Sequence, residues 1–366
     1  MRIALLANLK DNAPTWDGMP DDQWDDLDGH KTIDAILDAL KGGGHHAEFL
    51  EASILQPFDL VGQLLKYKPD LCFNIAEGHW GDSRETQIPS ILEMLRLPYT
   101  GSKLLALSLA LDKPMTKRVL YYHGLPTPEF QTFEAANEPI DADLLDDDNK
   151  ELRYPLFVKP SREGTSVGIT ADSVVNTKEE LREQITKQLE RYDQPILAEH
   201  FVKGRELTVG MVGNLDPSKS ARRVNERAQT NVLPDTLHFF PALEVNMEKY
   251  DDSEKGVYTN KIKVELADEF HWLCPAPIDA DFEHELRLLA GAVFRVIGCK
   301  DIARVDFRLD ERQNNKPYIL EVNPLPGLNP IYSDLAIEAK AGGWPHEKLI
   351  NTIVDLAAKR QGIKAS

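Results

Sequence analysis

Strand and helix patterns alternate at the start of this chain, and this alternation restricts the fold more than any other feature. Strands are predicted at 3–8, 47–50 and 71–75, because each range is a short apolar run. Helices are predicted between them, around 33–40 and 60–67, where apolar residues recur with helical spacing. Strands that alternate with helices in this way form parallel sheets covered by helices. The chain is therefore predicted to begin with a parallel βαβ domain of the α/β class.

The loop 10–29, between the first strand and the first helix, is polar and contains several aspartates and two tryptophans. It lacks the G-x-G-x-x-G pattern, so a dinucleotide site is not predicted there. Further along, a helical connection at 104–123 leads to Pro126 and Pro128, which are candidates for a domain boundary. The acidic range 134–153 is poor in large apolar residues and is predicted to be a surface loop.

The rest of the chain contains more strands than helices, which favours the α+β class in that part. Predicted strands lie at 156–158, 196–198, 207–212, 237–243, 261–266, 302–309 and 318–322. Predicted helices lie at 178–191, at 281–297 and after Ser333.

Size, charge and cysteine content exclude several classes of function. With 366 residues the chain can form two or three domains, and a net charge of −18 argues against a nucleic-acid partner, which needs a basic surface. The three cysteines fit neither a disulfide framework nor a zinc site, which indicates a reducing compartment. No apolar run is long enough to cross a membrane. We therefore expect a cytoplasmic protein with no membrane partner.

Two predicted strands near the C-terminus carry polar residues two positions apart, Arg304 with Asp306 and Glu321 with Asn323. Alternate residues of a strand share a face, so a hairpin of the two strands would bring all four side chains together. Two carboxylates and an amide oxygen suit a magnesium ion that carries nucleotide phosphates. An arginine beside them could stabilise charge that develops during a reaction. A hairpin face with ordinary surface charges stays open as the alternative.

A second stretch, 157–168, places Lys159 at the end of a strand, before a loop with two glycines and several hydroxyl groups. Glycines let backbone N–H groups approach a phosphate, and a lysine supplies the opposite charge. The order of residues is not that of a Walker loop. The stretch indicates a phosphate site, with a plain hairpin turn as the alternative.

Two glutamates, Glu199 and Glu206, stand near the end of one predicted strand and the start of the next. Carboxylates in such places can accept hydrogen bonds from an adenine amino group or from ribose hydroxyls. Ordinary surface glutamates are the alternative. Lys113 and Lys261 carry no signal on their own.

Together, in this order and at these spacings, these segments resemble the ATP-grasp superfamily, and within it the D-alanine–D-alanine ligases. The resemblance extends from about residue 71 to the C-terminal helices and includes the stretches 97–102 and 112–113. It implies a three-domain ATP-grasp architecture in which ATP binds between two sheets. The implied domains are an N-terminal domain at 1–110, a central subdomain at 111–205 and a C-terminal subdomain with the metal site at 206–366.

The resemblance also implies a role for particular residues. Contacts to ATP would come from Lys113, Lys159, Thr165, Ser166, Glu199, Val202 and Glu206. Two magnesium ions, with manganese as a substitute, would be bound by Asp306, Glu321 and Asn323. The catalytic residues would be Arg304, Ser166 and Lys261. The substrates would be contacted by His79, Arg304, Gly327 and Ser333.

The implied reaction is the ATP-dependent joining of a carboxylate to an amine through an acyl-phosphate. A D-alanine–D-alanine ligase or a close relative would act on small amino-acid-like substrates as a homodimer, in peptidoglycan synthesis. The chain departs from the family where its substrates would bind: 8–13 lacks the family's glutamate, and Trp80 stands where the ligases favour glycine. Two alternatives therefore stay open. One is a ligase of another carboxylate and amine in a secondary pathway, and the other is a non-catalytic ATP-binding protein.

Overall fold

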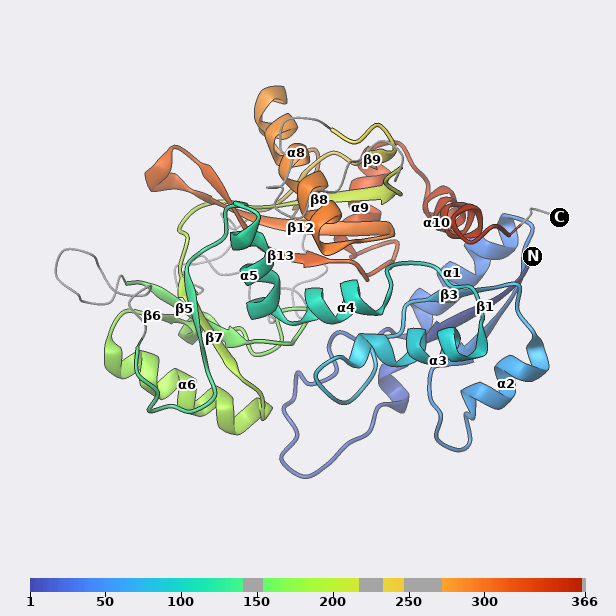
Figure 1. Ribbon diagram of the computed structural model, residues 1–366, viewed down its shortest axis with the longest axis horizontal. Coiled ribbons are helices and arrows are strands. Elements are labelled where there is room, and N and C mark those ends of the chain that lie inside the picture. Colours follow the sequence, from blue (N-terminus) through green and yellow to red (C-terminus); the bar gives the residue numbers. More distant parts are fainter. Residues whose placement is uncertain (141–153, 217–232, 247–271, 364–366) are drawn as a thin grey trace.

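The computed structural model describes residues 1–140, 154–216, 233–246 and 272–363. These residues form three β-sheets with helices packed against them (Figure 1). The first sheet is parallel, in the order β2–β1–β3, and consists of β1 (Arg2–Ala7), β2 (His46–Glu51) and β3 (Leu71–Asn74). The crossover helices are α1 (His30–Gly42) and α2 (Leu60–Tyr67). The predicted parallel βαβ domain is confirmed.

The second sheet is antiparallel, in the order β4–β7–β5–β6. Its strands are β4 (Phe130–Phe133), β5 (Leu156–Pro160), β6 (Val174–Val175) and β7 (Ile196–His200). One helix, α6 (Lys178–Tyr192), covers one face, because its buried Leu181 and Ile185 pack against apolar residues of the strands. The helix begins where the side chain of Thr177 accepts a hydrogen bond from the backbone N–H of Glu180.

The third sheet has β8 (Glu206–Gly213) at its centre, in the order β11–β10–β8–β12–β13, with β9 also paired to β8. The long hairpin is formed by β12 (Asp301–Asp310) and β13 (Lys316–Asn323). The helix α8 (Ala280–Ile297) covers one face of the third sheet. It begins where the side chain of Asp279 accepts a hydrogen bond from the backbone N–H of Phe282, and it ends at Gly298, whose backbone is in the left-handed region. The short strands are β9 (Leu237–Phe239), β10 (Leu243–Val245) and β11 (Trp272–Leu273).

The C-terminal helices connect the third sheet to the first. After α9 (Asp334–Ala341), α10 (His346–Arg360) lies against α1, and both helices contribute to one apolar cluster (Figure 1). At the end of α10, Arg360 lies 2.6 Å from Asp301 of β12 and donates hydrogen bonds to the backbone oxygens of Tyr99 and Gly101. The N-terminal and C-terminal parts are therefore held together on the side of the molecule away from the second sheet.

Several predicted elements differ from the structure. The strand predicted at 237–243 is two short strands, because Pro241 lies between β9 and β10 and has no N–H to donate. Two elements, α3 (Gln87–Leu95) and β4, were not predicted from the sequence. The predicted helical connection at 104–123 is present and consists of two helices, α4 (Leu104–Leu111) and α5 (Lys113–Tyr122). The strand predicted at 261–266, Lys261 and most of the loop 134–153 lie outside the described residues.

In the described ranges, no helix combines the length and the apolar character that a membrane crossing requires.

Candidate active site

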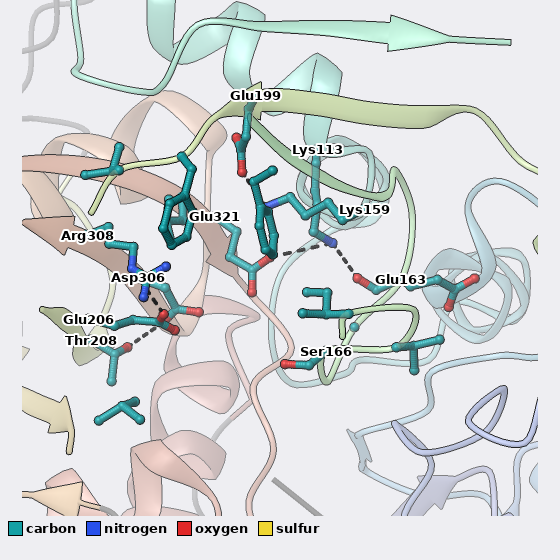
Figure 2. A pocket seen from close by; sticks show the side chains of 18 of the residues that line it. Lys113, Lys159, Glu163, Ser166, Glu199, Glu206, Thr208, Asp306, Arg308 and Glu321 are labelled. Atoms are coloured by element: carbon teal, nitrogen blue, oxygen red, sulfur yellow. Dashed lines mark hydrogen bonds and ion pairs between the residues drawn. The ribbon is translucent and has the colours of Figure 1, made fainter. Parts of the chain in front are cut away.

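The hairpin of β12 and β13 brings four polar side chains together as the sequence predicted. Arg304 pairs with Asn323 and Asp306 pairs with Glu321 in the register of the two strands. Asp306 accepts two hydrogen bonds of 2.8 Å from the guanidinium of Arg304 and one of 2.9 Å from the amide of Asn323. It also accepts one of 2.5 Å from the hydroxyl of Thr208 on β8. The carboxylate is thus fixed on the polar face of the sheet (Figure 2).

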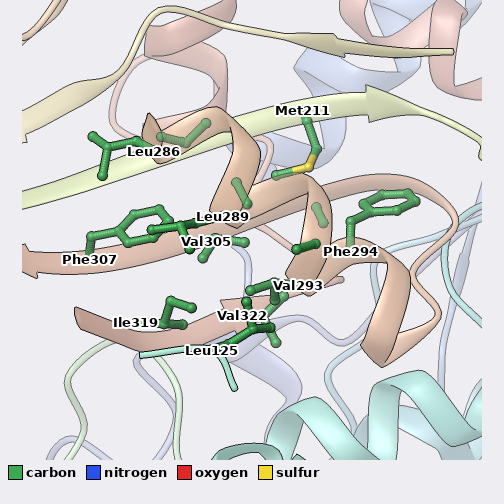
Figure 3. Packing of buried hydrophobic residues seen from close by; sticks show 14 of the residues in the cluster. Leu125, Met211, Leu286, Leu289, Val293, Phe294, Val305, Phe307, Ile319 and Val322 are labelled. Atoms are coloured by element: carbon green, nitrogen blue, oxygen red, sulfur yellow. The ribbon is translucent and has the colours of Figure 1, made fainter. Parts of the chain in front are cut away.

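The other face of the same strands is apolar, and its packing fixes which residues lie on the polar face. Val305 and Phe307 of β12 and Val322 of β13 pack beneath Leu286 and Val293 of α8 (Figure 3). Burial of such side chains contributes roughly 1.5–3 kcal/mol each. A shift of the register by one residue would turn them toward the solvent, so the packing also holds the polar residues in place.

Arg304 contacts a second carboxylate that the sequence analysis did not identify. Its Nη1 lies 3.1 Å from Oδ2 of Asp334, the first residue of α9. Burial opposes the charge of Arg304, but Asp306 and Asp334 outweigh it and raise the pKa of the guanidinium. Arg304 therefore stays charged. Its position directly after Ser333, at the start of a predicted helix, is the sequence feature that could have suggested Asp334 as a site residue.

Three lysines converge between the second and third sheets. Glu199 at the end of β7 lies 2.8 Å from Nζ of Lys159 and 2.6 Å from Nζ of Lys117. Burial alone would raise the pKa of Glu199, but the two ammonium groups lower it. Lys113 donates a hydrogen bond to the backbone oxygen of Glu163 and lies 3.6 Å from the carboxylate of Glu321 (Figure 2). Lys117, which follows Lys113 by one helical turn on α5, was not predicted from the sequence.

Lys113, Lys159 and Glu199 line a first cavity between the second and third sheets, together with apolar residues and further charged side chains. Phe157 and Phe201 stack with their ring centroids 5.9 Å apart, and Val202 lies beside them. Arg308 lies over the ring of Phe201 at 4.9 Å and 3.7 Å from the carboxylate of Glu206. An apolar slot with carboxylates at its edge suits a flat heterocycle that carries hydroxyl and amino groups.

The glycine-containing loop after Lys159 closes one side of this cavity. Thr165 and Ser166 adopt positive φ values of 44° and 58°, which turn the loop back on itself. Gly168 has a φ of 76°, and a Cβ there would lie 2.6 Å from the ring of Pro160. The backbone N–H of Gly168 donates a hydrogen bond of 2.9 Å to Asp22 of the N-terminal domain. The loop is therefore shaped partly by a segment far away in the sequence.

A second cavity, of about 450 Å³, adjoins the first. Gly164, Arg304, Glu321 and Asp334 line both cavities, so a ligand in one can touch a ligand in the other. The further lining residues that the sequence analysis selected are Thr165, Asn323, Gly327 and Ser333. A Cβ on Gly327 would lie 2.8 Å from the hydroxyl of Ser333, so a larger residue here would require the Ser333 side chain to shift.

His79 lies in an aromatic cluster and not among the residues that line the second cavity. Its ring packs edge-on against Trp24 at 5.3 Å, and Trp16 and Trp80 complete the cluster. Glu77, two residues earlier, lines the cavity instead. The segment 77–83 is a loop without strand or helix periodicity, so the sequence could not show which side chain points inward.

Four carboxylates, which we call the acidic wall, line one side of the second cavity: Asp26, Asp28, Glu77 and Glu85. Behind them Arg84 lies 2.6 Å from Asp26, 3.7 Å from Glu77 and 3.4 Å from Glu163. Burial, opposed by a hydrogen bond from Thr32, raises the pKa of Asp28 to about 6. Burial, opposed by Arg84, raises the pKa of Glu85 to about 7. Neither the acidic wall nor Arg84 was predicted from the sequence.

The polar face of the hairpin fits a magnesium ion by its chemistry. Asp306, Glu321 and Asn323 offer hard oxygen atoms side by side, as magnesium prefers. Within the described ranges no three His, Cys, Asp or Glu side chains form a metal site by themselves. The set would therefore need further oxygen atoms, such as those of phosphates. This is how magnesium usually binds in nucleotide sites.

Comparison with known proteins gives a consistent family. Residues 119–355 match the family model described as D-ala D-ala ligase C-terminus. The chain is 32% identical to a D-alanine–D-alanine ligase of Janthinobacterium, over 90% of this chain and 94% of that one. It is 34% identical to one of Cupriavidus metallidurans, over 88% and 85% of the two chains. It is also 30% identical to the uncharacterized protein y4sG of Sinorhizobium fredii, over 90% and 88%.

A solved structure has the same fold. It is the D-alanine–D-alanine ligase from Bacillus anthracis complexed with ATP, with a TM-score of 0.68 and 99% of both chains covered. The sequence identity is 19%, so the likeness concerns the fold.

Proposed function

This chain belongs to the D-alanine–D-alanine ligase family of ATP-grasp enzymes, which form C–N bonds, and we propose that it joins two amino acids with consumption of ATP. One observation carries the proposal: the two cavities meet at Arg304 and Glu321. A nucleotide in the first cavity and a carboxylate in the second would meet there. The arrangement suits phosphoryl transfer, in which the protein mainly positions the reactants and stabilises charge.

In the first cavity we propose that Phe201 and Val202 contact the adenine, with Glu199 accepting from its amino group. Glu206 would accept from the ribose hydroxyls. Lys113 and Lys159 would bind the phosphates, with Thr165 and Ser166 in the loop above them. The support is that these side chains line one cavity, apart from Thr165, which lines the second beside it. The catalytic role proposed for Lys261 rests on the family resemblance alone.

Asp306, Glu321 and Asn323 would hold magnesium, which would neutralise charge on the phosphate oxygens. A substrate carboxylate in the second cavity would attack the γ-phosphorus, breaking its bond to the β-phosphate oxygen and releasing ADP. The amine of the second substrate would then attack the acyl carbon, lose a proton and expel phosphate. Arg304 would stabilise the negative oxygens in both steps, because its charge is held at the junction of the cavities.

By the same family membership we propose a homodimer, a cytoplasmic location and a role in peptidoglycan synthesis. We propose domain limits of 1–110, 111–205 and 206–366, since the sheet changes between β7 and β8. A ligase of another carboxylate and amine is the second candidate, because 8–13 lacks the family's glutamate and Trp80 stands where the ligases favour glycine. The intact set of Arg304, Asp306, Glu321 and Asn323 weighs against a non-catalytic ATP-binding protein.

The test is ADP release by the purified protein with magnesium and ATP, followed by mass spectrometry of the products. The additions are D-alanine, L-alanine, other amino acids of either hand, hydroxy acids, and none. We expect ADP release that needs an amino acid and magnesium, with a product of the mass of a dipeptide. ADP release without any ligated product, or none with any amino acid, would contradict the proposal.

A further inference from the structure

We propose that Lys117 is a positioning residue for the nucleobase. By holding the carboxylate of Glu199 from outside the first cavity, it makes Glu199 select a purine with an amino group at position 6 over one with an oxygen there. The inference rests on the proposed function, because it concerns the same nucleotide site. Lys117 is not among the described residues that line the first cavity, so it would act through Glu199 and not by touching the nucleotide.

Lys117 is fixed against Glu199 by a chain of close contacts. Its side chain is 0% exposed, and Nζ lies 2.6 Å from Oε2 of Glu199, which is itself only 3% exposed. The same Nζ donates a hydrogen bond of 2.9 Å to the hydroxyl of Thr127, which donates one of 2.9 Å to the backbone oxygen of Ile319. A lysine is almost never buried completely unless it is paired. The carboxylate of Glu199 is therefore held by a cation that is itself anchored.

Lys159 holds the other oxygen of Glu199, but it has a second task. Its Nζ lies 2.8 Å from Oε1, and both side chains line the first cavity (Figure 2). In the proposed function Lys159 also binds the phosphates, which compete with Glu199 for its charge. Lys117 lies outside the described lining, so a bound nucleotide would leave its pairing with Glu199 intact.

The charges of Lys117 and Glu199 depend on each other. Burial opposes the ionised form of Glu199, but Lys117 and Lys159 outweigh it and lower the pKa of the carboxyl group. Burial likewise lowers the pKa of Lys117, and Glu199 opposes that change. Without Lys117, burial would favour the uptake of a proton by Glu199 once the phosphates engage Lys159.

The ionisation of Glu199 decides which purine it can bind. An ionised carboxylate only accepts hydrogen bonds, whereas a protonated carboxyl group can also donate one. The amino group at position 6 of adenine donates, so it suits the ionised form. An oxygen at position 6, as in hypoxanthine, would face the carboxylate without a proton between them. Loss of Lys117 should therefore weaken the discrimination between the two bases.

The direct test is calorimetric binding of ADP and IDP to the full chain with magnesium at pH 7. These two nucleotides differ at position 6 of the base and need no turnover. We expect the wild type to bind ADP at least about 10-fold more tightly than IDP, since hydrogen bonds to charged groups are strong. Lys117→Met should reduce this ratio at least about 5-fold. An unchanged ratio in this variant would overturn the inference.

A double variant tests whether Lys117 acts through Glu199. Glu199→Gln should lose most of the discrimination by itself, because an amide can both accept and donate. Adding Lys117→Met to Glu199→Gln should change the ratio no further, since residues in contact are expected to be non-additive. A further loss in the double variant would show that Lys117 acts on the base by another route and would overturn the inference.

Two more variants separate positioning from stability. Arg360→Met is the matched control, because it also breaks an ion pair with a buried carboxylate, that of Asp301, but lines neither cavity. It should keep the ratio, and an equal fall here would overturn the inference. Thr127→Val keeps the charge of Lys117 and removes only the hydroxyl that accepts its hydrogen bond. It should reduce the ratio about 2-fold. If Lys117→Met does not fold, an unchanged ratio in Thr127→Val overturns the inference.

The inference and the proposed function can fail separately. If amino acids cause ADP release and a dipeptide forms while Lys117→Met keeps the wild-type ratio, the ligase function holds and the inference fails. If the ratio falls as expected but no amino acid causes ADP release, the inference holds and the ligase function fails.

Discussion

The carboxylates at the two cavities of the cleft are neutralised by nearby cations to different extents. In the first cavity, Glu199 has two lysines within 2.8 Å, so a buried carboxylate is well neutralised. At the second cavity, the single Arg84 is shared by Asp26, Glu77 and Glu163. At the second cavity the described cations compensate the carboxylates less completely, and burial raises the pKa of Asp28 to about 6 and that of Glu85 to about 7.

The largest expected effect concerns the paired charges of the first cavity. Replacing Lys117 by Met should lower the free energy of unfolding by about 3 kcal/mol, because removing one partner leaves a buried charge poorly compensated. Urea unfolding of wild type and variant measures this. Lys203→Met is the matched control, since Lys203 is exposed and pairs with Glu311 at the surface. Equal effects of the two substitutions would show that the buried ion pair of Lys117 and Glu199 stabilises the protein no more than a surface pair does.

A comparable effect, on catalysis rather than stability, is expected where the cavities meet. Glu321→Gln should lower kcat for magnesium-dependent ADP release by about 10²–10³-fold, because it removes one carboxylate from the proposed metal site. Steady-state kinetics over a range of magnesium concentrations measures it. Glu311→Gln, at the exposed turn of the same hairpin, should leave kcat unchanged. Unchanged turnover in Glu321→Gln would remove Glu321 from the site.

The smallest expected effect is the pH dependence of the unbalanced second cavity. The pKa of Glu85 is raised from 4.5 to about 7, mainly by burial. The folded state therefore holds this proton more tightly than the unfolded state, and the resulting stability is lost as the pH rises through about 7. Glu85→Gln cannot ionise, so without ligand it should be more stable than wild type at pH 8, by about 1–3 kcal/mol. Near pH 5 the difference should be small.

Urea unfolding at the two pH values checks this expectation. Glu183→Gln, on the exposed face of α6, is the control and should show the same difference from wild type at both. If the advantage of Glu85→Gln did not grow with pH, burial of an ionised Glu85 would not be costly. The contrast between the two cavities would then be weaker.

The sequence alone determined those parts of the protein that depend on local periodicity. Arg304, Asp306, Glu321 and Asn323 share a face because strand side chains alternate, whatever the rest of the chain does. The parallel sheet of the N-terminal domain followed from apolar runs and helical spacing in the same way. Lys159 was identified because it ends a strand before a glycine-containing loop, both features of neighbouring residues.

Only the tertiary structure decided which distant side chains meet. Asp22 binds the backbone of Gly168, and Arg84 binds Glu163, across separations of 146 and 79 residues. These contacts come from loops and from the short 3₁₀ helix Arg84–Thr86, where no long repeating pattern relates the sequence to the direction of a side chain. For that reason the sequence suggested His79, whereas the folded chain turns Glu77 toward the cavity. The carboxylates of the second cavity come from such segments. They lie close together only when these segments are packed against the sheets.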